Sequence, residues 1–222
     1  MKRLLLSMLL TFTTSCYQPD KFSPSQKSFA FIVTRTQGEK ICVDGECKIK
    51  ITTGSGSGIV IKSFASNTQI LTAGHVCEAP PDGENFLAAV DSNGIIHNAI
   101  AAKFSEKPDL CLIKTAGEWG TPVKLSDDKL NYGDAVISMA APNGMFEPNM
   151  VLIFDGRYAG RTSENDEIFT LPCAPGSSGS AVLNEHGEIV SIVHSASKNF
   201  KTMAIGSNIK DINNFLEKLR DF

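Results

Sequence analysis

Three short motifs, which occur in a fixed order along the chain, constrain this sequence more than any other feature. His75 lies in the segment LTAGHV, Asp109 in KPDLCLI and Ser178 in PGSSGSAV. They supply an imidazole base, a carboxylate and a hydroxyl group, the three parts of a nucleophilic catalytic triad. A fold that uses all three must bring together positions that are far apart in the sequence.

The chain between these motifs consists of short apolar or alternating runs separated by Gly, Asn, Asp and Pro. The expected strands are 29–34, 58–61, 69–72, 95–101, 110–114, 135–139, 151–154, 168–171, 181–183, 189–194 and 203–205. Strands at this spacing without long helices between them predict an antiparallel barrel or sandwich. Residues 117–131, rich in Gly, Pro, Ser and Asp, separate two strand-rich halves. A site built from all three motifs would lie in the crevice between these halves.

One convincing helix is expected, at the C-terminal end. Asn208 can cap it, with Asp211 three residues later. The apolar residues that then share one face, and that we expect to dock on the domain, are Ile209, Ile212, Phe215, Leu216 and Leu219.

The N-terminal segment has the pattern of an export signal. Lys2 and Arg3 precede a short apolar run, and the following TTSC resembles a bacterial lipoprotein cleavage box. This pattern predicts a signal peptide over residues 1–15, acylation of Cys16 and a tether over 16–27. Tyr17 after the cysteine favours the outer membrane, with the protein facing the periplasm. Ordinary secretion and an uncleaved N-terminus are the alternatives.

Two cysteines are symmetrically placed about a hairpin turn. Asp44-Gly45 is a strong two-residue turn signal, so Cys42 and Cys47 become a facing pair on neighbouring strands. We expect a disulfide bond there, in an oxidising compartment.

The other cysteines allow more than one arrangement. Cys77 and Cys111 each lie two residues beyond a proposed triad member, so they either pair or leave Cys111 as a small buried hydrophobe. Cys173 would stay unpaired. The sequence has no close pair of cysteines or histidines with metal-site spacing, so no metal is expected. The net charge of −3, without basic runs, argues against nucleic acid as a partner.

The three motif residues have complementary chemical roles. His75 would take the proton of the Ser178 hydroxyl, and Asp109 would orient the imidazole and stabilise its charged form. The glycines around Ser178 permit a tight turn that aims the backbone N–H groups of Gly176 and Ser178 at one point. Such a pair of donors forms an oxyanion hole.

From about Phe29 onward, the sequence resembles the trypsin-like serine proteases of the chymotrypsin fold. The histidine, aspartate, serine order is the order in that family. Within that family, the sequence is closest in style to the bacterial Deg-type (high-temperature-requirement) branch. The resemblance rests on GSGSGIVI (54–61), ILTAGHV (70–76), DLCLIK (109–114), the segment GDAV to APNG (133–144), DGRYAGR (155–161) and GSSGSAVLNEHGEIV (176–190).

This resemblance implies an all-β fold with two antiparallel six-stranded β-barrels and a C-terminal α-helix. The peptidase domain would cover residues 28–222. Barrel one would occupy about 28–117, barrel two about 131–207 and the helix 208–220. The appended peptide-binding domain that Deg-type proteases often carry is not expected after Phe222.

The sequence also departs from the family pattern. Ser177 replaces the usual Asp or Asn before the nucleophile, and makes a rival nucleophile, while Ser180 replaces a common glycine. Pro172 stands where the family often reads its substrate, so a preference for Lys or Arg is not expected. His194 lies near the strand that would line the specificity pocket, where the similar glutamyl endopeptidases use a histidine to bind an acidic side chain. It is one residue out of step, which favours a structural role.

Together these observations predict a serine endopeptidase that acts on protein or peptide substrates through an acyl-enzyme and needs no cofactor. One alternative is a catalytically weak, peptide-binding lipoprotein of the cell envelope with the same fold. A hydrolase of non-peptide acyl compounds is disfavoured, because the histidine precedes the serine and no strand–elbow–helix pattern surrounds Ser178.

Overall fold

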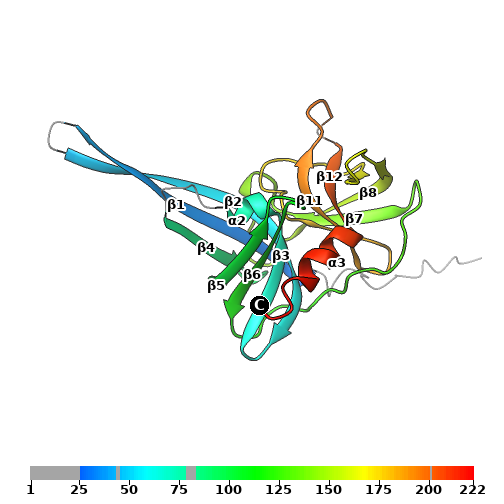
Figure 1. Ribbon diagram of the computed structural model, residues 1–222, viewed down its shortest axis with the longest axis horizontal. Coiled ribbons are helices and arrows are strands. Elements are labelled where there is room, and N and C mark those ends of the chain that lie inside the picture. Colours follow the sequence, from blue (N-terminus) through cyan, green and yellow to red (C-terminus); the bar gives the residue numbers. More distant parts are fainter. Residues whose placement is uncertain (1–25, 44–45, 79–83, 201) are drawn as a thin grey trace, which may run out of the picture.

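The computed structural model describes residues 26–43, 46–78, 84–200 and 202–222. Within these ranges, twelve strands form two closed antiparallel barrels of six strands each, and a helix follows the last strand (Figure 1). The expected fold class is therefore confirmed. The expected signal peptide, Cys16 and most of the tether lie outside the described residues.

The first barrel closes in the order β1-β2-β3-β6-β5-β4. Its strands are β1 (Phe29–Val43), β2 (Glu46–Phe64), β3 (Asn67–Thr72), β4 (Glu84–Val90), β5 (Ile96–Ser105) and β6 (Leu110–Ala116). Strands β3 and β6 are almost continuously buried, whereas β5 is open to solvent along much of its length. Branched side chains fill the barrel interior, including Ile32, Val60, Ile70 and Ile113.

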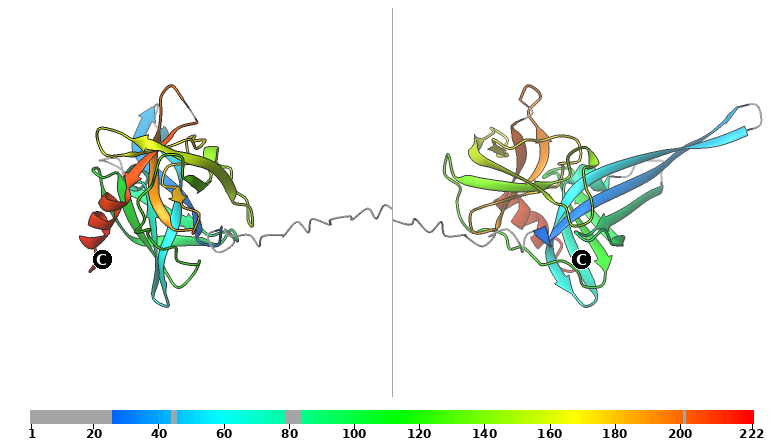
Figure 2. Two further views of the ribbon diagram at one scale, coloured as in Figure 1. Left: turned by 90° about the vertical axis from the view of Figure 1, so that its right-hand side faces the viewer. Right: turned by 180° about the vertical axis from the view of Figure 1, so that it is seen from behind.

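Strands β1 and β2 continue beyond the barrel as a long hairpin (Figures 1 and 2). Sequence reasoning expected only residues 29–34 and 58–61 as strand, because the distal part is polar and contains glycines. The pairing runs to Val43 opposite Glu46, with Cys42 opposite Cys47, and a disulfide bond joins these cysteines. Asp44 and Gly45 lie outside the described residues.

The second barrel closes in the order β10-β11-β12-β9-β8-β7. Its strands are β7 (Ala135–Ala140), β8 (Leu152–Arg161), β9 (Glu167–Phe169), β10 (Ala181–Leu183), β11 (Ile189–Ala196) and β12 (Ala204–Asn208). Its interior contains Val136, Phe169, Val182 and Val193. The two barrels thus repeat one architecture on different sequences.

A shared hydrophobic cluster joins the barrels and the C-terminal helix. Its buried members include Ile59 and Leu71 from the first barrel, and Met139 and Leu183 from the second. Helix α3 (Ile209–Glu217) adds the buried side chains of Ile212 and Phe215.

Helix α3 is shorter than the expected 208–220, but it begins where expected. The Asn208 side chain accepts a hydrogen bond from the Asp211 N–H at 3.0 Å, which caps the first turn. The other helical segments in the described ranges are the single turns α2 (Gly74–Cys77) and η1 (Pro142–Gly144). None of the helices described is long and apolar enough to cross a membrane.

Candidate active site

Two neighbouring strands of the first barrel bring His75 and Asp109 together. His75 lies on α2, which begins directly after β3, and Asp109 immediately precedes β6. The last residue of β3, Thr72, pairs with Cys111 of β6, so the end of one strand lies beside the start of the other. Both side chains are partly open to solvent, with 44% of the His75 side chain and 27% of the Asp109 side chain exposed.

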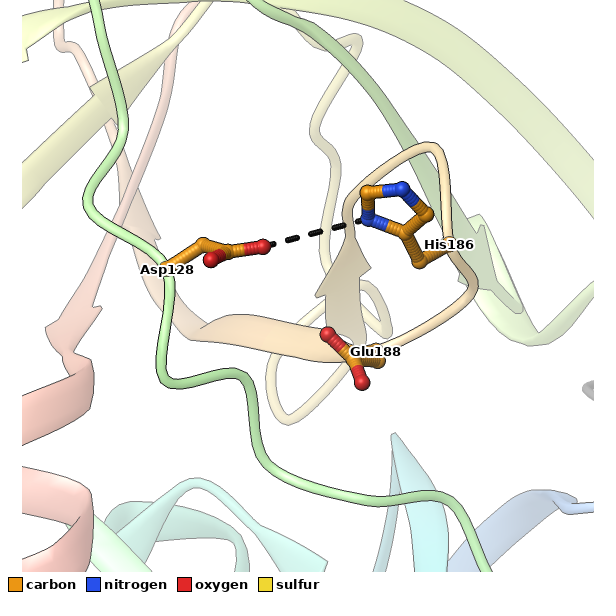
Figure 3. A group of neighbouring side chains, drawn as sticks. All are labelled: Asp128, His186 and Glu188. Carbon is orange, nitrogen blue, oxygen red and sulfur yellow. Dashed lines mark ion pairs between the residues drawn. The ribbon is translucent and has the colours of Figure 1, made fainter.

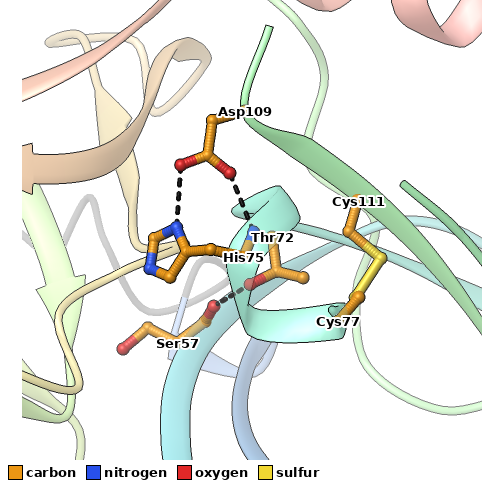
Figure 4. The surroundings of a disulfide bond; sticks show 6 residues. All are labelled: Ser57, Thr72, His75, Cys77, Asp109 and Cys111. Carbon is orange, nitrogen blue, oxygen red and sulfur yellow. Dashed lines mark hydrogen bonds and ion pairs between the residues drawn. A yellow bond between two sulfur atoms is a disulfide. The ribbon is translucent and has the colours of Figure 1, made fainter. Parts of the chain in front are cut away.

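Asp109 holds His75 through two hydrogen bonds. The His75 main-chain N–H donates to Asp109 Oδ1 at 2.8 Å, and the ring Nδ1 lies 2.7 Å from Asp109 Oδ2 (Figure 4). An ionised carboxylate only accepts hydrogen bonds, so Nδ1 carries a proton and, in the neutral ring, Nε2 is an acceptor. The arrangement therefore leaves a basic nitrogen available at the outer end of the ring.

The same contact shifts the pKa values of both groups. The hydrogen bond to Asp109 raises the pKa of His75 above 6.5, although partial burial works against it. Burial alone would raise the pKa of Asp109, but the hydrogen bonds from His75 outweigh it and lower that pKa below 3.8. Each partner thus favours the charged form of the other.

A buried serine connects the first barrel to the turn that carries Ser178. The Ser57 N–H on β2 donates to the Ser178 carbonyl at 2.7 Å, and Ser57 Oγ donates to the Gly176 carbonyl at 2.8 Å. Ser57 Oγ also accepts from the Ala141 N–H at 3.0 Å. The sequence predicted no role for Ser57 itself, because the glycine-rich run around it was noted only as a resemblance to the family. A serine within the buried middle of β2, residues 56–60, was the signal for this role.

The residue after Ser178 packs against the strand that leads to His75. Gly179 has φ +84°, and a Cβ there would lie 1.9 Å from Thr72 Oγ1 and 2.1 Å from the Ser57 carbonyl oxygen. Thr72 Oγ1 in turn donates to the Ser57 carbonyl at 2.7 Å (Figure 4). Only glycine fits this position, so the close approach of the two barrels depends on it.

Two backbone N–H groups in the turn at Ser178 have no acceptor among the described residues. Gly176 has φ +92°, and the preceding Pro175 carbonyl accepts from the Asn143 N–H at 2.5 Å. In the described part of the chain, neither the Gly176 N–H nor the Ser178 N–H donates to a protein acceptor. The described residues therefore leave both expected oxyanion-hole donors without a hydrogen-bond acceptor.

Ser178 is half-buried, and its hydroxyl makes no hydrogen bond with the described residues, including His75 Nε2. Hydrogen bonds between catalytic groups are often long in the absence of substrate and shorten when substrate binds. The rival Ser177 is 2% exposed, and its Oγ accepts from the Ala174 N–H at 3.3 Å. Of the two hydroxyl groups, that of Ser178 is the more accessible.

The two expected specificity residues lie in different surroundings. Pro172 is exposed, and the adjacent Cys173 is the one unpaired cysteine within the described ranges; burial raises the pKa of its thiol. His194 on β11 lies 3.5 Å from Asp166, through its Nε2. It lines a cavity of about 620 Å³ that includes Asp109 but not Pro172. That cavity has an acidic lining that sequence reasoning did not anticipate.

A disulfide bond joins Cys77 to Cys111, with 6.4 Å between the Cα atoms (Figure 4). Of the two arrangements left open by the sequence, the structure contains the paired one. The bond connects the last residue of α2 to the second residue of β6, next to the His75–Asp109 pair.

Comparison with known proteins gives a consistent result. The family model for the trypsin-like peptidase domain matches residues 56–192. Two curated relatives, both serine protease Do-like HtrA of Lactococcus lactis, are 25% identical over 184 residues (subsp. cremoris, strain MG1363) and 26% over 192 (subsp. lactis, strain IL1403). These matches cover 77% and 81% of this chain but 43% and 45% of the relatives, so the chain spans less than half their length.

Solved structures share the fold. A serine endoprotease from Yersinia pestis matches with a TM-score of 0.66 at 18% identity, over 90% of this chain and 65% of that one. The HtrA-type protease AlgW with a decapeptide matches with a TM-score of 0.72 at 16% identity, over 90% and 66%. At these sequence identities, the comparison with solved structures shows that the fold is shared.

Proposed function

Because the chain belongs to the trypsin-like peptidase domain family and is similar to HtrA-type proteases, we propose that it hydrolyses peptide bonds through Ser178, His75 and Asp109. The substrates would be proteins or peptides, and no cofactor takes part. The observation that carries this proposal is the pair of hydrogen bonds from His75 to Asp109, which fixes the ring and leaves Nε2 free to accept a proton.

The proposed reaction has two steps. In the first, Ser178 Oγ attacks the carbonyl carbon of the substrate while His75 Nε2 takes the hydroxyl proton. Asp109 stabilises the imidazolium, and the Gly176 and Ser178 N–H groups stabilise the oxyanion. His75 then gives the proton to the leaving amine, the C–N bond breaks and an acyl-enzyme forms. In the second step water attacks this ester by the same route, which releases the acid and restores Ser178.

Active-site labelling with a fluorophosphonate probe tests this proposal. We expect covalent labelling of the wild type, located at Ser178 by mass spectrometry of its peptides, and no labelling of Ser178→Ala. Ser177→Ala, which removes the neighbouring hydroxyl, serves as the matched control and keeps the label. An unlabelled but folded wild type would favour the peptide-binding alternative. Labelling that persists in Ser178→Ala would identify another nucleophile.

We also propose an exported location and a domain division. Residues 1–15 would be removed as a signal peptide, Cys16 acylated, and residues 16–27 would tether the peptidase domain, 28–222, to the outer membrane on its periplasmic side. Several acyl chains make such an anchor stable, whereas one alone holds a protein only marginally. Incorporation of labelled palmitate by the wild type, and its loss in Cys16→Ser, would support the anchor. Unlabelled, freely released wild type would support ordinary secretion.

A further inference from the structure

Three potential metal ligands gather on the second barrel, outside the candidate active site. Asp128 comes from the segment between the barrels, while His186 and Glu188 come from the turn between β10 and β11. One ligand atom from each residue lies within 4.8 Å of the other two. The Asp128 carboxylate and the Nδ1 edge of the His186 ring face each other, with the Glu188 carboxylate beside them (Figure 3).

The distances between the ligand atoms suit coordination of a shared ion better than direct hydrogen bonds between the side chains. Asp128 Oδ2 and His186 Nδ1 are 3.9 Å apart, which is too long for a hydrogen bond. A metal ion with bonds of about 2.0–2.2 Å to nitrogen and oxygen holds its ligand atoms roughly 3–4 Å apart. Small side-chain rotations would therefore bring the three groups around one ion.

One buried hydrogen-bond network sets the backbone of all three residues. Asn184, 8% exposed, accepts from the N–H groups of His186 and Glu188 at 3.0 and 2.9 Å through its Oδ1. Its Nδ2 donates to Ser126 Oγ at 3.1 Å, and that oxygen accepts from the Asp128 N–H at 3.1 Å. The two chain segments are thus held in register before any ion binds.

A cavity opens beside the cluster and adds oxygen atoms. Its volume is about 370 Å³, and Asp128 and His186 line it together with Asn131, Asp134 and Glu185. Asp128 and His186 are largely open to solvent, with 71% and 64% of their side chains exposed. An ion there would keep water in its remaining coordination positions, as ions in open sites do.

We propose that Asp128, His186 and Glu188 bind a divalent transition-metal ion of the zinc type. The imidazole selects for this class, because Mg²⁺ and Ca²⁺ prefer oxygen ligands only. The ion connects the segment between the barrels to the β10–β11 turn, so it stabilises the folded state by preferential binding. This inference does not depend on the proposed peptidase activity.

Isothermal titration and thermal unfolding of the purified full chain with zinc chloride at pH 7.5 test it. We expect an equimolar binding step and, at a free zinc concentration of about 100 times Kd, a rise in Tm of roughly 5–10 °C. His186→Ala and Glu188→Gln should each weaken binding about tenfold or more. Asp127→Asn is the matched control, because it removes an exposed acidic charge next to Asp128 without removing a proposed ligand or a residue that lines the cavity.

Magnesium chloride at equal concentration separates coordination from charge screening, and it should leave the Tm unchanged. Zinc binding of equal strength in wild type and His186→Ala would place the ion elsewhere and overturn the proposal. Absence of zinc binding by wild type, or an equal response to magnesium, would overturn it as well.

Discussion

Cys77 and Cys111 are joined by a disulfide bond, and each lies two residues beyond one member of the His75–Asp109 hydrogen-bonded pair. The bond connects the end of α2 to β6, so the two segments that carry His75 and Asp109 are held together covalently as well as by hydrogen bonds (Figure 4). Both cysteines are buried.

Replacing both cysteines with alanine should destabilise the fold and weaken catalysis. The bond closes a loop with a sequence separation of 34 residues, and its loss should lower the free energy of unfolding by about 2–4 kcal/mol. Urea unfolding of the double variant Cys77→Ala, Cys111→Ala measures this. The corresponding Cys42→Ala, Cys47→Ala variant is the control. Its bond spans only five residues near the end of the projecting hairpin, so the loss should be smaller. Equal losses in the two variants would contradict this account.

The pH dependence of activity should report the contact between His75 and Asp109. The proposed mechanism needs neutral His75, so kcat/KM should rise with pH through the pKa of this group. That pKa is raised, chiefly by the hydrogen bond to Asp109, so the midpoint should lie above pH 6.5. Asp109→Asn removes the carboxylate, and the midpoint should move to lower pH while the rate falls about 10⁴-fold.

The rate of fluorophosphonate labelling as a function of pH gives both midpoints, and NMR titration of the His75 ring measures its pKa independently of catalysis. A His75 pKa that is unchanged by Asp109→Asn would show that the carboxylate does not act on the ring.

Gly179 should tolerate no side chain, because its surroundings and its backbone both exclude one. A methyl group there would collide with Thr72 Oγ1 and the Ser57 carbonyl, at a φ of +84°. Gly179→Ala should cost at least about 3 kcal/mol of stability from strain and overpacking together. Gly133→Ala is the matched control: its φ is +88°, but nothing lies within 4 Å of the added Cβ. The control should lose only about 1–2 kcal/mol in urea unfolding. Similar losses at both sites would mean that contact with the first barrel does not constrain the turn.

Local patterns in the sequence predicted most of the architecture. Apolar runs gave most of the strands, because buried strands such as β3 and β6 consist of the residues that a packed barrel interior requires. The Asn208 cap gave the start of α3. The distal half of the β1–β2 hairpin was missed, because its polar residues carry no burial pattern and the strands pair with each other outside the barrel.

Long-range contacts were harder to predict than elements. Motif order predicted that His75 and Asp109 would meet, and they do so because His75 follows the end of β3 and Asp109 precedes the start of its partner strand β6. The link from Ser57 to the Ser178 turn joins residues of different barrels, and no local pattern specifies it. No local pattern specifies the contact of Asp128 with His186 and Glu188 either, because it brings a residue from between the barrels to a turn that is distant in the sequence.

Tyr158 should make stability sensitive to strongly alkaline pH. Its hydroxyl donates to the buried Glu167 carboxylate at 2.7 Å, and burial together with this contact raises its pKa from 10.0 to about 12. The folded state thus favours the neutral phenol. The resulting stability is complete below pH 10 and is lost as the pH rises towards 12.

Tyr158→Phe should cost about 1.5–3 kcal/mol at pH 8, since it removes a hydrogen bond to a charged group. It should also flatten the loss of stability between pH 10 and 12. Urea unfolding at a series of pH values measures both effects. Tyr132→Phe, at a ring that is 80% exposed and stacks on Tyr158, is the control and should keep the wild-type profile. If Tyr158→Phe retained the full alkaline loss, another group would be responsible for it.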